Sequence, residues 1–179
     1  MSSFAIQVGN PLVDRSIAGI FQDLSDVVQE AFHWPTEDAI LYWNRIPVRI
    51  SYKYDLYVMM DDILPTLGEV LNTEEGSSYV RWASNTFDGA WDIQWRQGCI
   101  TVVAKWNKIV GGYEKVLQDQ PQIEVTVDEF LAEWRGLLGK VLEAVDREGV
   151  DVEDRTNLDI LKHIMASVPR YGQLYAHSA

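Results

Sequence analysis

The chain has 179 residues, with 27 acidic and 15 basic side chains and a formal net charge of −12 at pH 7. This excess of negative charge argues against nucleic-acid binding and against an anionic membrane surface as partner, because both require a cationic face. A single cysteine, an opening segment unlike a signal peptide and the lack of a long apolar run lead us to expect a cytoplasmic protein.

The N-terminal residues predict one strand and one helix. Apolar and polar side chains alternate over residues 4–8, which is typical of a short strand. Apolar residues then recur over 17–32 with the spacing of one helix face. The dipeptide Trp34-Pro35 is expected to end this helix, since the residue before a proline disfavours the α region.

The next strand shows the clearest period-two pattern in the chain. It covers residues 46–54, and Pro47 must lie at its start or on a sheet edge because proline cannot donate to the ladder. Residues 56–60 are compatible with a continuation of this strand. A helix is predicted from Asp61 or Asp62 to about Leu71, with Pro65 in its first turn.

A tryptophan-rich hairpin follows a loop at 73–78, a strand at 79–84 and a turn at 85–89. If Gln97-Gly98 is a two-residue turn, it determines which residues of the two strands face each other, because the residue numbers in every facing pair have the same sum. The facing pairs are then Trp95 with Ile100, Ile93 with Val102, Trp91 with Ala104, and Trp106 with Gly89. This register places the tryptophans on one apolar face, together with Val80 and Trp82 of the preceding strand.

The sequence predicts mainly helices in the C-terminal half of the chain. After Gly111-Gly112, residues 113–121 are expected to form a short helix or loop. Thr126 and Glu129 have the spacing of a capping box before a long apolar stripe, and Gly149 suits the left-handed position past the helix end. A last helix is predicted near residues 154–168.

These elements predict an α+β fold in which an antiparallel sheet of about four to six strands carries long amphipathic helices on its apolar face. No linker divides the chain, so residues 1–179 are expected to form a single domain, with residues 170–179 frayed. Trp91, Trp95 and Trp106 are expected to fill the core rather than to line a ligand cage. Trp34 and Trp43 lie outside the periodic stripes, where a surface contact and local packing are both open.

Sequence motifs for catalysis or cofactor binding are lacking. The histidines His33, His163 and His177 have no metal-ligand partners at helical or strand spacing, and Cys99 has no nucleophile signature. The acidic pairs Asp61-Asp62 and Glu74-Glu75 could suggest a carboxylate metal site, but adjacent residues point in different directions. We therefore expect no catalytic residue, no metal and no cofactor, and hence no enzyme.

Negative charge is concentrated toward the C-terminus, where residues 114–159 hold 13 acids and 5 bases. A dense run between the last two predicted helices contains Asp146, Glu148, Asp151, Glu153 and Asp154. This run is either a solvated loop or a docking surface for a cationic protein.

Three segments, RWASNTFDGAWDIQW, ITVVAKW and VTVDEFLAEWRGLL, resemble the small acidic, Trp-rich α+β immunity proteins of bacterial polymorphic-toxin systems. The resemblance covers roughly residues 45–148 and rests on pattern rather than on a diagnostic motif. It implies a non-enzymatic protein that binds a cognate toxin domain and occludes its active site.

Two other functions remain open from the sequence. One is a small-molecule-binding or enzymatic domain whose aromatic pocket, with Arg49, Tyr52 or Trp43, lies between the sheet and the helices. The other is a self-assembling structural protein that uses an exposed sheet edge. For the immunity function, the expected partner is a basic toxin, and the expected contacts are the five acids of the C-terminal run with Trp34 and Trp43.

Overall fold

The computed structural model describes residues 2–169. The expected fraying of residues 170–179 and the place of His177 lie outside the described residues. The strands are β1 (Phe4–Gln7), β2 (Gly19–Phe21), β3 (Ala39–Trp43), β4 (Ile46–Ile50), β5 (Glu75–Ala83), β6 (Phe87–Arg96), β7 (Cys99–Ile109), β8 (Gln122–Thr126) and β9 (Val150–Val152). The helices are α1 (Leu24–Ala31), α2 (Leu56–Asn72), α3 (Glu114–Gln118), α4 (Val127–Val145) and α5 (Thr156–Ser167).

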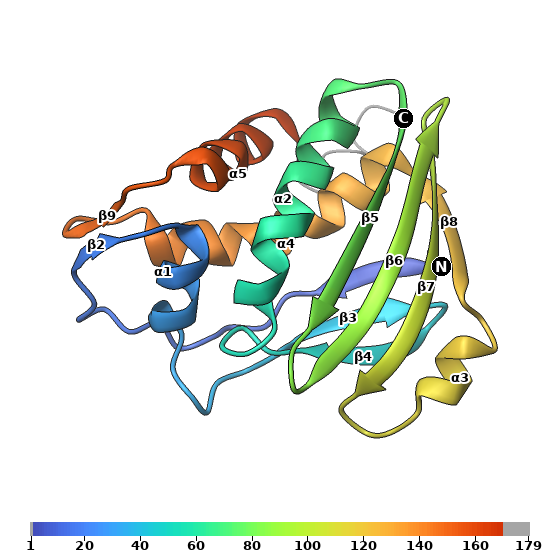
Figure 1. Ribbon diagram of the computed structural model, residues 1–179, viewed down its shortest axis with the longest axis horizontal. Helices are drawn as coiled ribbons and strands as arrows, with labels where there is room; N and C mark the ends of the chain where they lie inside the picture. Colours follow the sequence, from blue (N-terminus) through green and yellow to red (C-terminus); the bar gives the residue numbers. More distant parts are fainter. Residues whose placement is uncertain (1, 170–179) are drawn as a thin grey trace, which may run out of the picture.

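The predicted α+β class is confirmed, although the strands form two antiparallel sheets rather than one. The larger sheet has the order β5-β6-β7-β8, and the smaller has the order β1-β3-β4. Figure 1 shows the strands of the smaller sheet crossing behind those of the larger sheet, with α2 and α4 to the left of the larger sheet. A separate parallel ribbon of β2 and β9 lies at the far end of the molecule.

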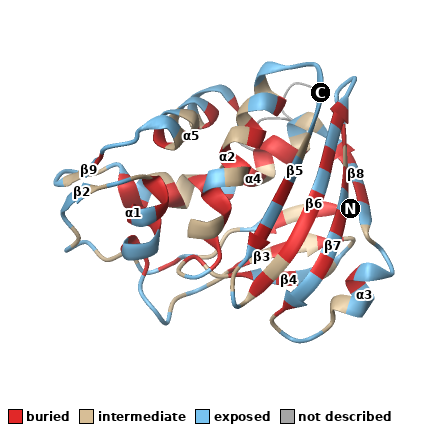
Figure 2. Ribbon diagram, in the orientation of Figure 1, coloured by how far each residue is buried: buried red, intermediate tan, exposed pale blue. Residues whose placement is uncertain are grey.

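The predicted register of the tryptophan hairpin is confirmed. Trp95 pairs with Ile100, Trp91 with Ala104, and Trp106 with Gly89. Gln97 and Gly98 both have positive φ, as the favoured two-residue hairpin turn requires. Figure 2 shows buried and exposed residues alternating along β6 and β7, so one face of the larger sheet is packed and the other faces solvent.

Trp91 lies at the centre of the aromatic core. Its ring centroid is 4.8 Å from that of Trp82, 5.2 Å from Trp43, 6.2 Å from Trp106 and 6.4 Å from Trp134. These tilted and edge-on contacts join both sheets and α4, which is the geometry that aromatic pairs favour. The prediction that the hairpin tryptophans are core residues is confirmed.

Trp43 as a surface-contact residue was a wrong prediction. Its side chain is 0 % exposed, and its Nε1 donates to the carbonyl of Gln120 at 2.8 Å. The residue ends β3, a strand that sequence periodicity did not reveal, and pairs with Ile46 across a turn with positive φ at Asn44 and Arg45. Strand pairing therefore turns Trp43 inward between the two sheets.

The predicted helix at 17–32 is shorter than expected. Gly19 has a φ of 136°, which a helix cannot include, and Asp23 caps α1 by accepting from the N–H of Asp26 at 3.0 Å. Residues 19–21 form β2 instead, so Ile20 does not belong to a buried helical face.

Helix α2 begins earlier than predicted. The strand at 46–54 ends at Ile50, and residues 56–60 form the first turns of α2 rather than strand. Asp61 and Asp62 therefore lie within the helix, and Pro65 is an interior residue. The predicted position of Pro47 is confirmed, because β4 is an edge strand.

The C-terminal predictions hold more closely. Thr126 and Glu129 form the capping box of α4. Gly149 has the expected positive φ of 86°, but α4 already ends at Val145, so this glycine lies in the turn before β9 rather than just past the helix end. The short helix α3 and the last helix α5 are both present, while β8 was missed. Among residues 2–169, no helix combines the length and the apolar character that a membrane crossing requires.

Candidate functional site

The β2–β9 ribbon contains much of the acidic run that the sequence singled out. Gly19, Ile20 and Phe21 pair in parallel with Val150, Asp151 and Val152. The N–H of Gly19 donates to Gly149 at 2.7 Å, and the N–H of Glu153 donates to Phe21 at 2.9 Å. The expected loop at 146–154 thus includes a strand fixed by backbone bonds.

Side-chain alternation divides the ribbon into an inner and an outer face. Val152 is buried and Phe21 is partly buried, so both pack toward the core. Their neighbours Ile20 and Asp151 point the other way, and Ile20 is 73 % exposed. An exposed isoleucine opposite an exposed aspartate is a feature that sequence analysis missed, because Ile20 fitted a helical stripe.

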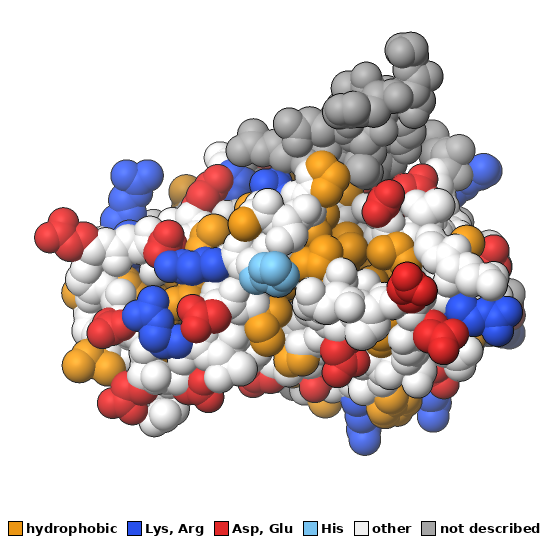
Figure 3. All heavy atoms as spheres, turned by 90° about the horizontal axis from the view of Figure 1, so that it is seen from above, with side chains coloured by type: hydrophobic (Ala, Val, Ile, Leu, Met, Phe, Trp, Pro, Cys, Tyr) orange, Lys and Arg blue, Asp and Glu red, His pale blue; other side chains and the backbone are white. Residues whose placement is uncertain are grey.

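All five acids of the predicted contact set are exposed on or beside this ribbon. Asp146 pairs with Lys162 at 2.8 Å, and Asp151 lies 3.7 Å from Arg155. Within residues 2–169, Glu148 and Glu153 have no ion-pair partner. Figure 3 shows acidic side chains spread over this end of the molecule, interspersed with basic ones. We call Ile20 with Asp146, Glu148, Asp151, Glu153 and Asp154 the acidic ribbon.

Asp154 has a structural role in addition to its charge. Its Oδ1 accepts from the N–H of Thr156 at 3.0 Å, at the start of α5. Hydrogen bonds from Thr156 lower the pKa of Asp154, because they stabilise the ionised carboxylate. Asp154 therefore helps to fix the turn that begins α5.

Trp34 is exposed, as the surface-contact alternative required, with 67 % of its surface accessible. The segment from Leu12 to Asp14 connects its surroundings to the acidic ribbon. The N–H of His33 donates to Leu12 at 3.0 Å, and Arg147 donates to the carbonyl of Asp14. Leu12 is itself exposed, so this segment adds one exposed apolar side chain close to Trp34.

A small cavity of about 180 Å³ is lined by Trp34 and Asp55 among other residues. The Asp55 carboxylate is buried, accepts from Thr86 Oγ1 at 2.5 Å and from the Ser51 N–H at 2.7 Å, and also accepts from Ser84. Burial raises the pKa of Asp55, partly offset by these hydrogen bonds. The network ties the start of α2 to the β5–β6 turn, which is a structural role.

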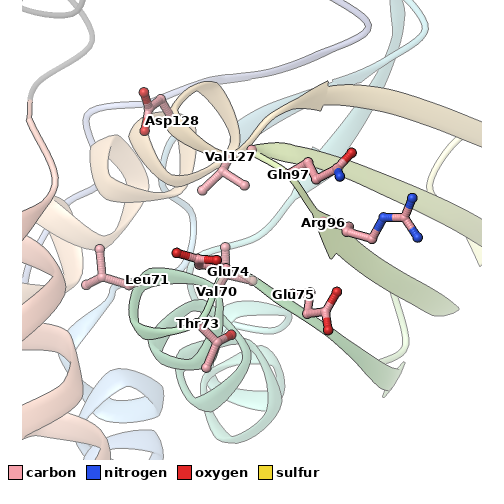
Figure 4. A pocket seen from close by; sticks show the side chains of 10 residues that line it. Val70, Leu71, Thr73, Glu74, Glu75, Arg96, Gln97, Val127 and Asp128 are labelled. Carbon is pink, nitrogen blue, oxygen red and sulfur yellow. The ribbon is translucent and has the colours of Figure 1, made fainter.

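A hollow of about 1010 Å³ lies between the end of α2, the β6–β7 turn and the start of α4. Figure 4 shows that Glu75, Arg96 and Asp128 around it point in different directions. Polar groups that select a small molecule converge on one point, and these do not. Of the residues named for an aromatic pocket, Tyr52 and Trp43 are buried in the core, whereas Arg49 pairs with Asp38 and lines the small cavity beside Trp34.

The remaining chemical candidates are dispersed. Residues 2–169 contain no group of three histidine, cysteine or acidic side chains arranged to hold a metal ion. Asp61 accepts from Ser25 and from Asn157, both at 2.9 Å, and so joins α1, α2 and the start of α5. Cys99 is exposed and free at the hairpin turn.

The comparisons with known proteins leave the family open. No family model, no curated protein and no solved structure matches the chain.

Proposed function

We propose that the protein is a non-enzymatic antidote that binds a basic toxin domain and blocks its active site, as an immunity protein of a bacterial polymorphic-toxin system does. The observation that carries the proposal is the acidic ribbon. It places Ile20, an exposed apolar side chain, among acids of which Glu148 and Glu153 have no counter-ion within residues 2–169.

This arrangement resembles the usual anatomy of a protein interface, in which an apolar centre is surrounded by a polar rim. In the proposed complex, Ile20 enters an apolar depression on the toxin and loses its contact with water. The acids around it pair with lysine or arginine side chains of the toxin. Trp34 and Leu12 extend the contact, since the segment 12–14 leads from one region to the other.

Charge has a second role in the proposal. A net charge of −12 attracts a basic domain before contact and raises its rate of association. An antidote must reach the toxin before the toxin acts, so fast association is the property that negative charge supplies. The ribbon backbone is held by hydrogen bonds at both ends, which lowers the ordering cost of binding.

The proposal expects a toxin domain to be encoded in the neighbouring coding sequence, and the experiment uses that domain. Co-expression should allow cells producing that domain to grow, and the purified proteins should form a complex. Ile20→Ser should weaken the complex at least tenfold, mainly through faster dissociation. Val116, an exposed apolar residue on α3, provides the matched control as Val116→Ser, which should leave affinity unchanged. Equal affinities for the wild type and both variants would contradict the placement of the interface.

A further inference from the structure

The two antiparallel sheets have four edges, and side chains of residues 2–169 cover three of them. Glu133 of α4 accepts from the N–H of Ile6 at 2.6 Å, which covers the open side of β1. On β4, Pro47 has no N–H to offer, and its carbonyl accepts from the Tyr113 hydroxyl. Both edges of the smaller sheet are therefore closed to another strand.

The β8 edge of the larger sheet is closed in the same way. Ser3 Oγ donates to the carbonyl of Glu124 at 3.0 Å, and Asn44 Nδ2 donates to that of Gln122 at 2.9 Å. Unpaired edges attract other strands, and proteins commonly cover them in this manner. Within residues 2–169, the β5 edge is the one of these four that is not covered in this way, and it is the longest, with nine residues.

Backbone geometry shows which groups of β5 are free. The N–H of Ser84 donates to Phe87 at 3.0 Å, and backbone groups alternate in direction along an antiparallel strand. The odd-numbered residues Ser77, Tyr79 and Arg81 therefore turn their N–H and C=O groups away from β6. Within residues 2–169, no group bonds them. Figure 1 shows β5 as the outermost strand of the larger sheet.

The side chains of β5 indicate what pairs with this edge. An antiparallel copy of β5 placed about a twofold axis at Ser78 brings Glu75 opposite Arg81 and Arg81 opposite Glu75. Both side chains are exposed, and neither has an ion-pair partner among residues 2–169. Opposite charges that face each other across strands stabilise the pairing.

We propose that β5 of one copy pairs with β5 of a second copy in this register, joining the two four-stranded sheets edge to edge in a homodimer. The interface is isologous, so each contact occurs twice. Local charge is compatible with association despite the acidic chain, because residues 75–108 hold four basic and three acidic side chains. The proposal is independent of the toxin-binding function and concerns different residues.

The test is sedimentation equilibrium of the purified protein over a concentration series. The wild type should form a dimer, and Glu75→Arg and Arg81→Glu should each raise the dimer dissociation constant roughly tenfold or more by placing like charges opposite each other. The double variant Glu75→Arg/Arg81→Glu restores opposite charges and should restore the dimer. A wild-type monomer at every attainable concentration would overturn the proposal, and so would a dimer unaffected by the single charge reversals.

Two controls separate edge pairing from other effects. Lys105→Glu makes the same charge change as Arg81→Glu on the same sheet face, but on β7, away from the edge, and should leave the dimer intact. Tyr79→Pro removes an outward N–H, spares the β5–β6 ladder and should give a monomer. If Tyr79→Pro fails to fold, the double variant Glu75→Arg/Arg81→Glu still tests the proposal. A double variant that does not restore the dimer would contradict the proposed register.

Discussion

Gly76 lies beneath the indole ring of Trp95, its pairing partner across β5 and β6. A Cβ atom at Gly76 would stand 2.2 Å from Cζ2 and 2.7 Å from Cε2 of that ring. The ring is nearly fully buried, and its Nε1 donates to Thr73 Oγ1 at 3.0 Å, so it has little freedom to move. The bare backbone at Gly76 is thus a requirement of the tryptophan packing.

Gly76→Ala should therefore destabilise the protein by about 1–3 kcal/mol, the usual cost of overpacking. Urea unfolding followed by tryptophan fluorescence measures this change. Ser77→Ala, at the next and exposed position of the same strand, is the control and should change stability by less than about 0.5 kcal/mol. A Gly76→Ala variant as stable as the control would mean that the Trp95 ring lies elsewhere.

The effect of replacing a tryptophan by alanine on the unfolding free energy should depend on how deeply the side chain is buried. Trp43→Ala and Trp95→Ala should each lower the unfolding free energy by about 3–5 kcal/mol, since both remove a large buried ring. Trp34→Ala should change it by less than about 0.5 kcal/mol, because that side chain is exposed. Chemical denaturation of the three variants checks this order, and a large loss for Trp34→Ala would refute it.

Sequence reasoning was most accurate where one pattern determined the structure. The tryptophan hairpin has a strict alternation on both sides of Gln97-Gly98, and only one register buries its apolar face. The capping box at Thr126 and Glu129 was similarly unambiguous, because its two hydrogen bonds are local. These patterns specify β6, β7 and the start of α4 without reference to the rest of the chain.

Sequence reasoning was least accurate where pairing with a distant segment determines the conformation. Ile20 fitted a helical stripe, but its strand exists only because β9 pairs with it from more than 100 residues away. The burial of Trp43 likewise depends on the position of β3 between β1 and β4. In the candidate site, the exposure of the five acids was predicted correctly, whereas the ribbon and Ile20 were not, since both follow from long-range pairing.

The buried carboxylate of Asp55 should give stability a specific pH dependence. Burial raises its pKa in the folded state, so folding favours the protonated form. Its stabilising contribution is complete below the unfolded pKa of about 3.9 and is lost as pH rises through the folded pKa. The unfolding free energy of the wild type minus that of Asp55→Asn should therefore fall as pH rises from about 4. Denaturation of both proteins over a pH series measures this difference, and a difference that grows with pH would contradict the assignment.

Protein purified without chelators or metal-affinity steps should contain no stoichiometric zinc, iron or manganese. The reason is geometric, because Asp61 already accepts hydrogen bonds from Ser25 and Asn157 and is not free for a metal. Elemental analysis by mass spectrometry measures the content. One tightly held equivalent of metal would revive a carboxylate site at the acidic pairs 61–62 or 74–75.

The central claim is that the acidic ribbon guides and holds a basic toxin domain. Its most direct test is the association rate of the two proteins, measured by stopped flow over a range of salt concentrations. The triple variant Glu148→Gln, Asp151→Asn and Glu153→Gln should associate more slowly and with a flatter salt dependence, while its fold is unchanged. A control with the same change of net charge, Glu74→Gln, Asp92→Asn and Asp119→Asn, alters exposed acids outside the ribbon and should behave much more like the wild type. If the ribbon variant keeps the wild-type rate and salt dependence with a confirmed partner, the ribbon is not the docking surface.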